Sequence, residues 1–242
     1  MMLKRSKVVY WRSAACLLLA AGTLCACTKP QIETPAEGSK KQAEITVLQP
    51  VVNVRTRKDE LKNSKAAPAD HETARTDWAF KIDTELDYHI ADEKNDLQDK
   101  QNGYHIWIDI TGVRLKLALP ITTQISHQAP KYVFEHENGH VKICRRIYAD
   151  ARKLATEAAT KVFEKRFEGF GKDQKMALSN ALQFAGQELA AYYRVKTAGE
   201  AEKVSSKYDQ ICLSEDRKEQ VDKTIEDAFA AVDAEEKAAP QK

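Results

Sequence analysis

The middle of the chain alternates apolar and polar positions with a period of two, which is typical of strands buried on one face. One such stretch runs from Trp78 to Ile90, and a second runs from Tyr104 to Leu119. In the second stretch the apolar positions change parity at Gly112. This change predicts either a tight hairpin or a β-bulge at Gly112.

The second half of the chain repeats its apolar positions with the 3.6-residue period of α-helices. A long helix is expected from Tyr132 to Phe163, a second from Asp173 to Lys196 that ends near Gly199, and a third through Val221–Val232. Because strands come first and helices follow, the pattern predicts an α+β fold: N-terminal antiparallel strands, then a long helix and two further helices.

The first residues are typical of an export signal. Residues 1–12 are basic, and residues 14–26 are apolar but shorter than the roughly 20 residues that span a bilayer. The run ends in Leu24-Cys25-Ala26-Cys27, which resembles a bacterial lipobox. We therefore expect residues 1–26 to be a lipoprotein signal peptide and Cys27 to carry the lipid, which would place the protein at the outer membrane facing the periplasm. A signal cleaved without lipidation and an uncleaved anchor are the alternatives.

The formal net charge of +2 includes four cations of the leader, so the rest of the chain carries −2. This charge gives no reason to expect a nucleic-acid partner. Residues 27–76 are mostly polar and predict a flexible tether, with one β-like stretch at Ile45–Val54 that Pro50 interrupts. The folded domain is expected at 77–235, followed by a disordered tail at 236–242.

The long helix contains His136-Glu137-Asn138-Gly139-His140, an HExxH motif. Residues four apart share a helix face, so His136 and His140 can bind one Zn²⁺. Glu137 can then reach a zinc-bound water and act as general base for attack on a carbonyl. A chance match on a helix surface is the alternative.

These residues resemble the predicted secreted bacterial zinc-dependent proteases of the zincin type. The resemblance covers about Trp78 to Phe229 and is best from the Leu115–Pro120 strand end through the HExxH motif to Ile147-Tyr148-Ala149. It returns at Tyr208-Asp209, where the family has Tyr-Asp followed by Thr and then His-Gly. This chain has Cys212 at the Thr position and Ser214 at the His position. The resemblance implies zinc-dependent peptidase activity of undefined substrate class.

The third zinc ligand must come from outside the motif, and no histidine follows His140. The extended His-rich metzincin pattern is therefore excluded, and a later carboxylate is expected. The candidates are Asp209, Glu188, Glu200 and Glu215. Asp209 is preferred because it matches the family motif and lies three residues before Cys212.

A disulfide between Cys144 and Cys212 is expected, since processing removes Cys16 and Cys25 and lipid occupies Cys27. This bond would bring Asp209 to the metal helix. Two separate buried thiols are the alternative.

Other residues give weaker signals. Three histidines, His89, His105 and His127, are expected on strand faces or loops. The aromatic residues Tyr192, Tyr193 and Tyr208 are candidates for an oxyanion donor, although helical aromatics usually belong to the core.

The sequence thus predicts an envelope-anchored zinc metallopeptidase that acts on unfolded or extended polypeptide, with the strand Val113–Leu119 as the sheet edge that receives the substrate. A non-catalytic lipoprotein of the same fold, serving as a binding or assembly module, is the main alternative. A zinc hydrolase of cell-wall amides is the third.

Overall fold

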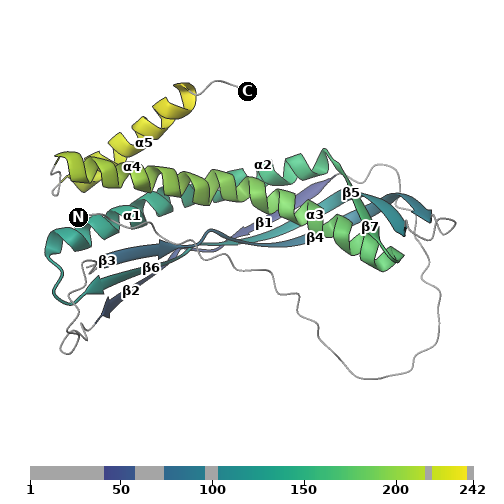
Figure 1. The fold of residues 1–242 in the computed structure, drawn as a ribbon, viewed down its shortest axis with the longest axis horizontal. Helices are drawn as coiled ribbons and strands as arrows, with labels where there is room; N and C mark the ends of the chain where they lie inside the picture. The colour runs from purple at the N-terminus through teal and green to yellow at the C-terminus, as the bar shows by residue number, and fades with distance from the viewer. Residues whose placement is uncertain (1–40, 58–73, 96–102, 216–219, 239–242) are drawn as a thin grey trace.

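The computed structural model describes residues 41–57, 74–95, 103–215 and 220–238, which form a layer of β-strands covered on one face by helices (Figure 1). This arrangement confirms the expected α+β class. The predicted signal peptide, Cys27 and residues 239–242 lie outside the described residues.

The strand layer consists of two sheets that continue one another. The described strands are β1 (Gln42–Val47), β2 (Val51–Arg57), β3 (Ala74–Trp78), β4 (Lys81–Asn95), β5 (Tyr104–Ala118), β6 (Pro120–Ser126) and β7 (Arg166–Gly171). One sheet has the order β1-β5-β4, with β7 also paired to β5, and the other has the order β2-β6-β3. Main-chain hydrogen bonds at the junctions, such as the 3.0 Å bond from Val51 N to Leu119 O, join the two sheets.

Two expectations about the N-terminal part are wrong. Strands β1 and β2 run parallel to β5 and β6, so the sheets are mixed and not purely antiparallel. The predicted tether contains β1, β2 and the start of β3. Strands β1 and β2 each pair on one side and are largely exposed, with Ile45 buried in β1. Their polar composition therefore resembles that of a linker. Pro50 falls in the gap between them, where no ladder hydrogen bond from its nitrogen is needed.

Strand β5 is the central strand of its sheet, which excludes the expected role of Val113–Leu119 as a sheet edge. Residues 112–117 of β5 pair with β1 on one side and with β4 on the other. The parity change is a β-bulge and not a hairpin. Asp87 of β4 pairs with Gly112 and Tyr88 pairs with Ile110, so Thr111 is the extra residue of the bulge.

The helices form two antiparallel rods over the sheets and one further helix (Figure 1). The first rod is α1 (Lys131–Ala149) and α2 (Ala151–Phe163), separated at Asp150 where one continuous helix was expected. The second rod is α3 (Gln174–Arg194), a π-helical turn η1 (Val195–Gly199) and α4 (Glu200–Glu215).

The second rod passes through Gly199, so the expected helix end there is wrong. Helix α5 (Val221–Ala238) packs against α4 and α1 and includes residues 236–238 of the predicted disordered tail.

The core lies between β5 and the helices. The inward residues of β5 are fully or almost fully buried: Ile106, Ile108, Ile110, Val113, Leu115 and Leu117. They face α2 and α3, whose buried positions are mostly alanine and so allow the helices to lie close to the sheet. Because the rods are antiparallel, the C-terminal half of α4 meets the N-terminal half of α1, which carries the HExxH motif.

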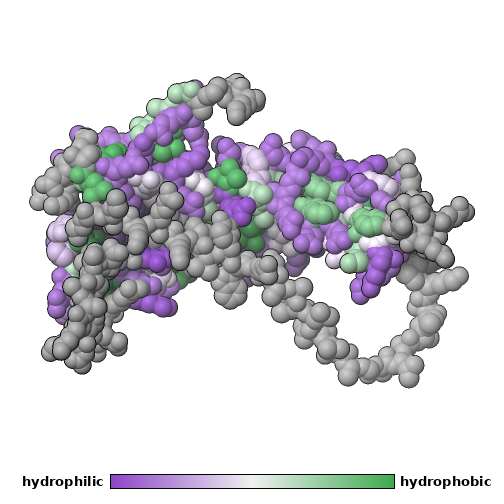
Figure 2. Space-filling model, viewed as in Figure 1, coloured by the Kyte–Doolittle hydropathy of each residue, from purple (hydrophilic) through white to green (hydrophobic). Residues whose placement is uncertain are grey.

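The face seen in Figure 2 is mainly hydrophilic, with apolar residues in small separate groups. No helix within the described ranges is long and apolar enough to cross a bilayer.

Candidate metal site

The HExxH residues lie in the first half of α1, which begins after the extended residue Pro130. His140 is buried, with 8% of its surface exposed, and His136 is partly exposed. The two rings have their centroids 5.1 Å apart, as residues one turn apart on the same helix face require.

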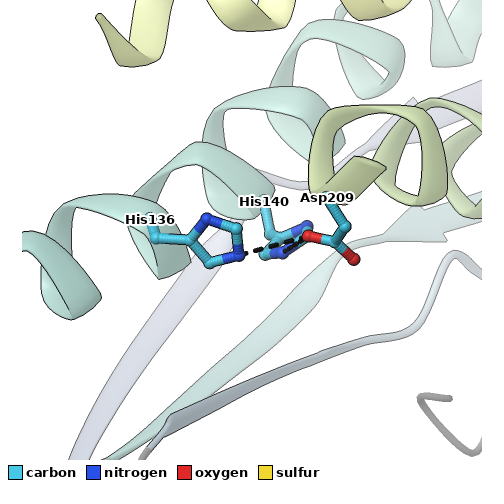
Figure 3. Close-up of side chains that lie close together, drawn as sticks. All are labelled: His136, His140 and Asp209. Carbon is cyan, nitrogen blue, oxygen red and sulfur yellow. Dashed lines mark ion pairs between the residues drawn. The ribbon is translucent and has the colours of Figure 1, made fainter. Parts of the chain in front are cut away.

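Helix α4 brings Asp209 to this pair, as Figure 3 shows. Its Oδ1 atom lies 3.1 Å from Nε2 of His136 and 3.1 Å from Nε2 of His140. One ligand atom from each residue lies within 4.8 Å of the others. The preferred candidate for the third ligand therefore meets both histidines.

Asp209 lies at the spacing from each histidine that a tetrahedral ion requires. Ligands at about 2.0–2.1 Å from Zn²⁺ lie about 3.3 Å apart, close to the observed contacts. Oδ1 of Asp209 is buried and receives no hydrogen bond from the described residues, although two imidazoles face it. A cation bound by all three residues would satisfy this oxygen, so the site fits a metal ion.

Electrostatics tie the three residues together. Burial lowers the pKa of His136, but the Asp209 carboxylate and the Cys212 side chain beside it raise the pKa to about 10. Burial raises the pKa of Asp209, but His136 and His140 lower it to about 2. Without metal, the site is therefore an ion pair, and a metal ion must displace the proton of His136.

Of the other candidate carboxylates, Glu188 and Glu200 lie elsewhere. Glu188 forms an ion pair with Lys165. Glu200 lies near Glu236 and Asp233, and burial together with these two acids raises its pKa. The side chain of Glu215 is outside the described residues.

Glu137 is buried, with 7% of its surface exposed, and turns toward the sheet layer. Thr76 of β3 donates a hydrogen bond of 2.7 Å from Oγ1 to Glu137 Oε2. The sequence pattern did not point to Thr76, which falls within the predicted tether. The signal was the alternation of residues 74–78, which continues toward the predicted strand that starts at Trp78.

Tyr208 packs α4 against the motif helix. Its ring is fully buried, stacks on His136 at 5.0 Å and meets His140 edge-on at 5.3 Å. Its hydroxyl donates to the main-chain oxygen of His136 at 3.4 Å and lies over Gly139. This buried hydroxyl holds the two helices together, which does not suit an oxyanion donor.

The expected disulfide is wrong, because Cys144 and Cys212 are free thiols. Since α4 runs antiparallel to α1, the turn after Asp209 leads Cys212 toward His136 and away from Cys144. His136 and Cys144 are eight residues apart on one helix, or about 12 Å at 1.5 Å per residue.

The remaining residues behave as structural ones. His105 pairs with Glu168 at 3.1 Å on the strand surface, and His89 and His127 are exposed. Tyr192 donates to Glu157, and Tyr193 is buried in the core. Among the described residues, His136, His140 and Asp209 form the one group of three or more His, Cys, Asp or Glu side chains that could hold a metal ion.

Comparison of the chain with protein-family models, with curated proteins and with solved structures gave no match.

Proposed function

We propose that this protein is a zinc-dependent metallopeptidase of the zincin type. One observation carries the proposal: two imidazole nitrogens of an HExxH helix and a carboxylate from another helix converge with 3.1 Å contacts. Glu137 follows the first of these ligands in the chain. A purely structural site has no use for a general base at this position.

The residues divide the work as follows. His136, His140 and Asp209 hold the ion, with both histidines neutral. Zinc supplies Lewis acidity, which polarises a substrate carbonyl and makes water a nucleophile near neutral pH. Glu137 takes a proton from the attacking water and returns it to the leaving amine.

Strand β3 supports extended polypeptide as the substrate. Within the described residues, β3 is an edge strand of its sheet, and Trp78 at its end stacks on His140 with the ring centroids 6.1 Å apart. A peptide that paired with the free edge of β3 would pass beside the ligand. This edge replaces Val113–Leu119, which lies inside the sheet.

The test uses the purified protein with a broad peptide library and metal analysis. The wild type should contain about one zinc per chain and cleave peptides, and His136→Ala should lose the metal. Glu137→Gln should keep the metal and lose about 10²- to 10⁴-fold in rate. Equal cleavage by wild type and Glu137→Gln, or no bound metal in either, would refute the proposal.

A second candidate function is a non-catalytic binding module that a structural metal ion stabilises, and Cys212 favours it. The Cys212 side chain interacts with His136 and with the hydroxyl of Tyr208. A thiolate would complete a closed, four-ligand site, which is typical of structural zinc. Cobalt-substituted protein distinguishes the two functions. A thiolate-to-cobalt charge-transfer band that disappears in Cys212→Ser indicates the module, and its absence from the wild type indicates the peptidase.

The cell-envelope location is part of the proposal and rests on the leader and Cys27. Cys27→Ser, expressed in a bacterial host, should move the protein from the membrane fraction to the soluble fraction. Unchanged partitioning, with no added lipid mass on the wild type, would contradict lipidation.

A further inference from the structure

The hydroxyl of Thr76 connects the sheet layer to the proposed general base. Thr76 is almost fully buried in β3, and its Oγ1 lies 2.7 Å from Glu137 Oε2. On its other side the same oxygen lies 3.2 Å from Oγ1 of Thr123, a buried residue of the neighbouring strand β6. Three side chains from three elements therefore form one buried row.

The number of available protons decides which group donates each hydrogen bond in this row. An ionised carboxylate only accepts hydrogen bonds, and a hydroxyl has a single proton to donate. Thr76 must therefore donate to Glu137, and the proton between the two threonines must come from Thr123. Within the described part of the chain, no group donates a hydrogen bond to the other carboxylate oxygen of Glu137, Oε1.

We propose that Thr76 is a positioning residue, which fixes Glu137 through Oε2 and leaves Oε1 as the atom that accepts the proton. This inference rests on the proposed peptidase function. An O–H bond of water breaks as Oε1 takes the proton, and the hydroxide oxygen forms a bond to the peptide carbonyl carbon. Oε1 then returns the proton to the nitrogen as the C–N bond breaks, so peptide and water become acid and amine.

Strand β3 also contacts a proposed zinc ligand. Trp78 lies two residues after Thr76, on the same side of the strand, and its ring stacks on His140. One short strand thus touches both the base and a ligand. A base bound to this strand keeps its position relative to the ion, as proton transfer within hydrogen-bond reach requires.

The experiment measures kcat, KM and zinc content for Thr76→Val, which replaces the hydroxyl with a methyl group of similar size. Because one hydrogen bond orients the base, kcat should fall about 10- to 100-fold, while KM and zinc stay within about threefold of wild type. Thr76→Ser should restore most of the rate. Thr122→Val is the matched control, because Thr122 precedes Thr123 in β6 and its side chain points to the opposite face. This variant should change none of kcat, KM and zinc content.

Variants made in the Glu137→Gln background show whether Thr76 acts by positioning Glu137 or by a general effect on the structure. If Thr76 acts through Glu137, adding Thr76→Val to Glu137→Gln should change the residual rate by less than about twofold. Should Thr76→Val fail to fold, Thr76→Ser and Thr76→Ala form a second pair, since both lack the methyl group and differ only in the hydroxyl.

A readout without activity checks the contact itself. In NMR spectra of metal-free protein, the hydroxyl proton of Thr76 should give a visible signal, because it exchanges slowly with water. This signal should be absent from Thr76→Ala.

The possible failures can be told apart. An active wild type with an equally active Thr76→Val overturns the inference and leaves the proposed function standing. An equal loss of rate with and without Glu137, or loss of zinc from Thr76→Val, also overturns it. A zinc-loaded wild type with no activity refutes the proposed function, and the positioning role of Thr76 with it.

Discussion

Gly139→Ala tests how closely α4 must approach the helix that carries the metal ligands. A Cβ atom at residue 139 would collide with the hydroxyl oxygen of Tyr208 and lie 2.6 Å from its Cζ. Carbon atoms in contact prefer about 3.5–4.0 Å, so Tyr208 would have to move by about 1 Å. The ring cannot swing aside, because it is fully buried between His136 and His140.

The strain should therefore displace α4 as a whole. Overpacking of this kind costs about 1–3 kcal/mol of unfolding free energy. The displacement also moves Asp209, the neighbour of Tyr208, away from the histidines that it now contacts at 3.1 Å. We expect zinc affinity to fall about 10- to 100-fold, as when other support of a metal ligand is lost.

Gly186→Ala is the matched control, because it makes the same change in a helix where no atom lies within 4 Å of the new Cβ. The unfolding free energy of this variant should rise by about 0.5–1 kcal/mol, since alanine favours helix more than glycine does. Tyr208→Phe removes the atom closest to the new Cβ. The double variant with Gly139→Ala should therefore lose less unfolding free energy than the sum of the losses of the two single variants.

The assays are urea unfolding of the metal-free variants and zinc competition against a chelator of known affinity. A Gly139→Ala variant that gained as much stability as Gly186→Ala and bound zinc like the wild type would refute the packing argument.

Four further predictions concern the metal site and the two cysteines. Because zinc must displace the proton of His136, whose pKa is raised to about 10, affinity measured by chelator competition should rise almost tenfold per pH unit from about pH 7 to about 9, and a flat profile would contradict this. Metal-free protein should keep the full stability of the ion pair with Asp209 between about pH 4 and 6.5, and lose it as the pH falls through about 2 or rises through about 10. Asp209→Asn should lose zinc and Glu188→Gln should retain it, as metal analysis would show; equal retention would exclude Asp209 as a ligand. Peptide mapping of unreduced protein should recover both thiols free, with Cys212 alkylated faster than the buried Cys144, and a recovered disulfide would contradict the structure.

Much of the fold follows from local patterns. Alternation located β4 and β5, and the parity change at Gly112 marked the bulge, because side chains in a strand must point to opposite faces in turn. For β1 and β2 the sequence indicated only one β-like stretch, Ile45–Val54, within the predicted tether. Among the described residues each of these strands pairs on one side and is largely exposed, which leaves little apolar signal. Strand β7 was missed because it falls in the short gap between the first two predicted helices, where Gly169 and Gly171 leave little apolar alternation. A side chain at either position would collide with α3.

For the site, the sequence by itself determined the pairing of His136 and His140, since four residues on a helix fix their relation before any other part of the chain is placed. The sequence also indicated Asp209, although one reason for this choice, the expected disulfide between Cys144 and Cys212, was wrong. Tertiary structure alone decided which carboxylate meets the histidines and which side chain holds Glu137. Thr76 lies 61 residues before Glu137, and Tyr208, the neighbour of Asp209, lies 72 residues after His136. Sequence spacing carries no information about such distant contacts. They depend on how the antiparallel helices and the mixed sheet pack together.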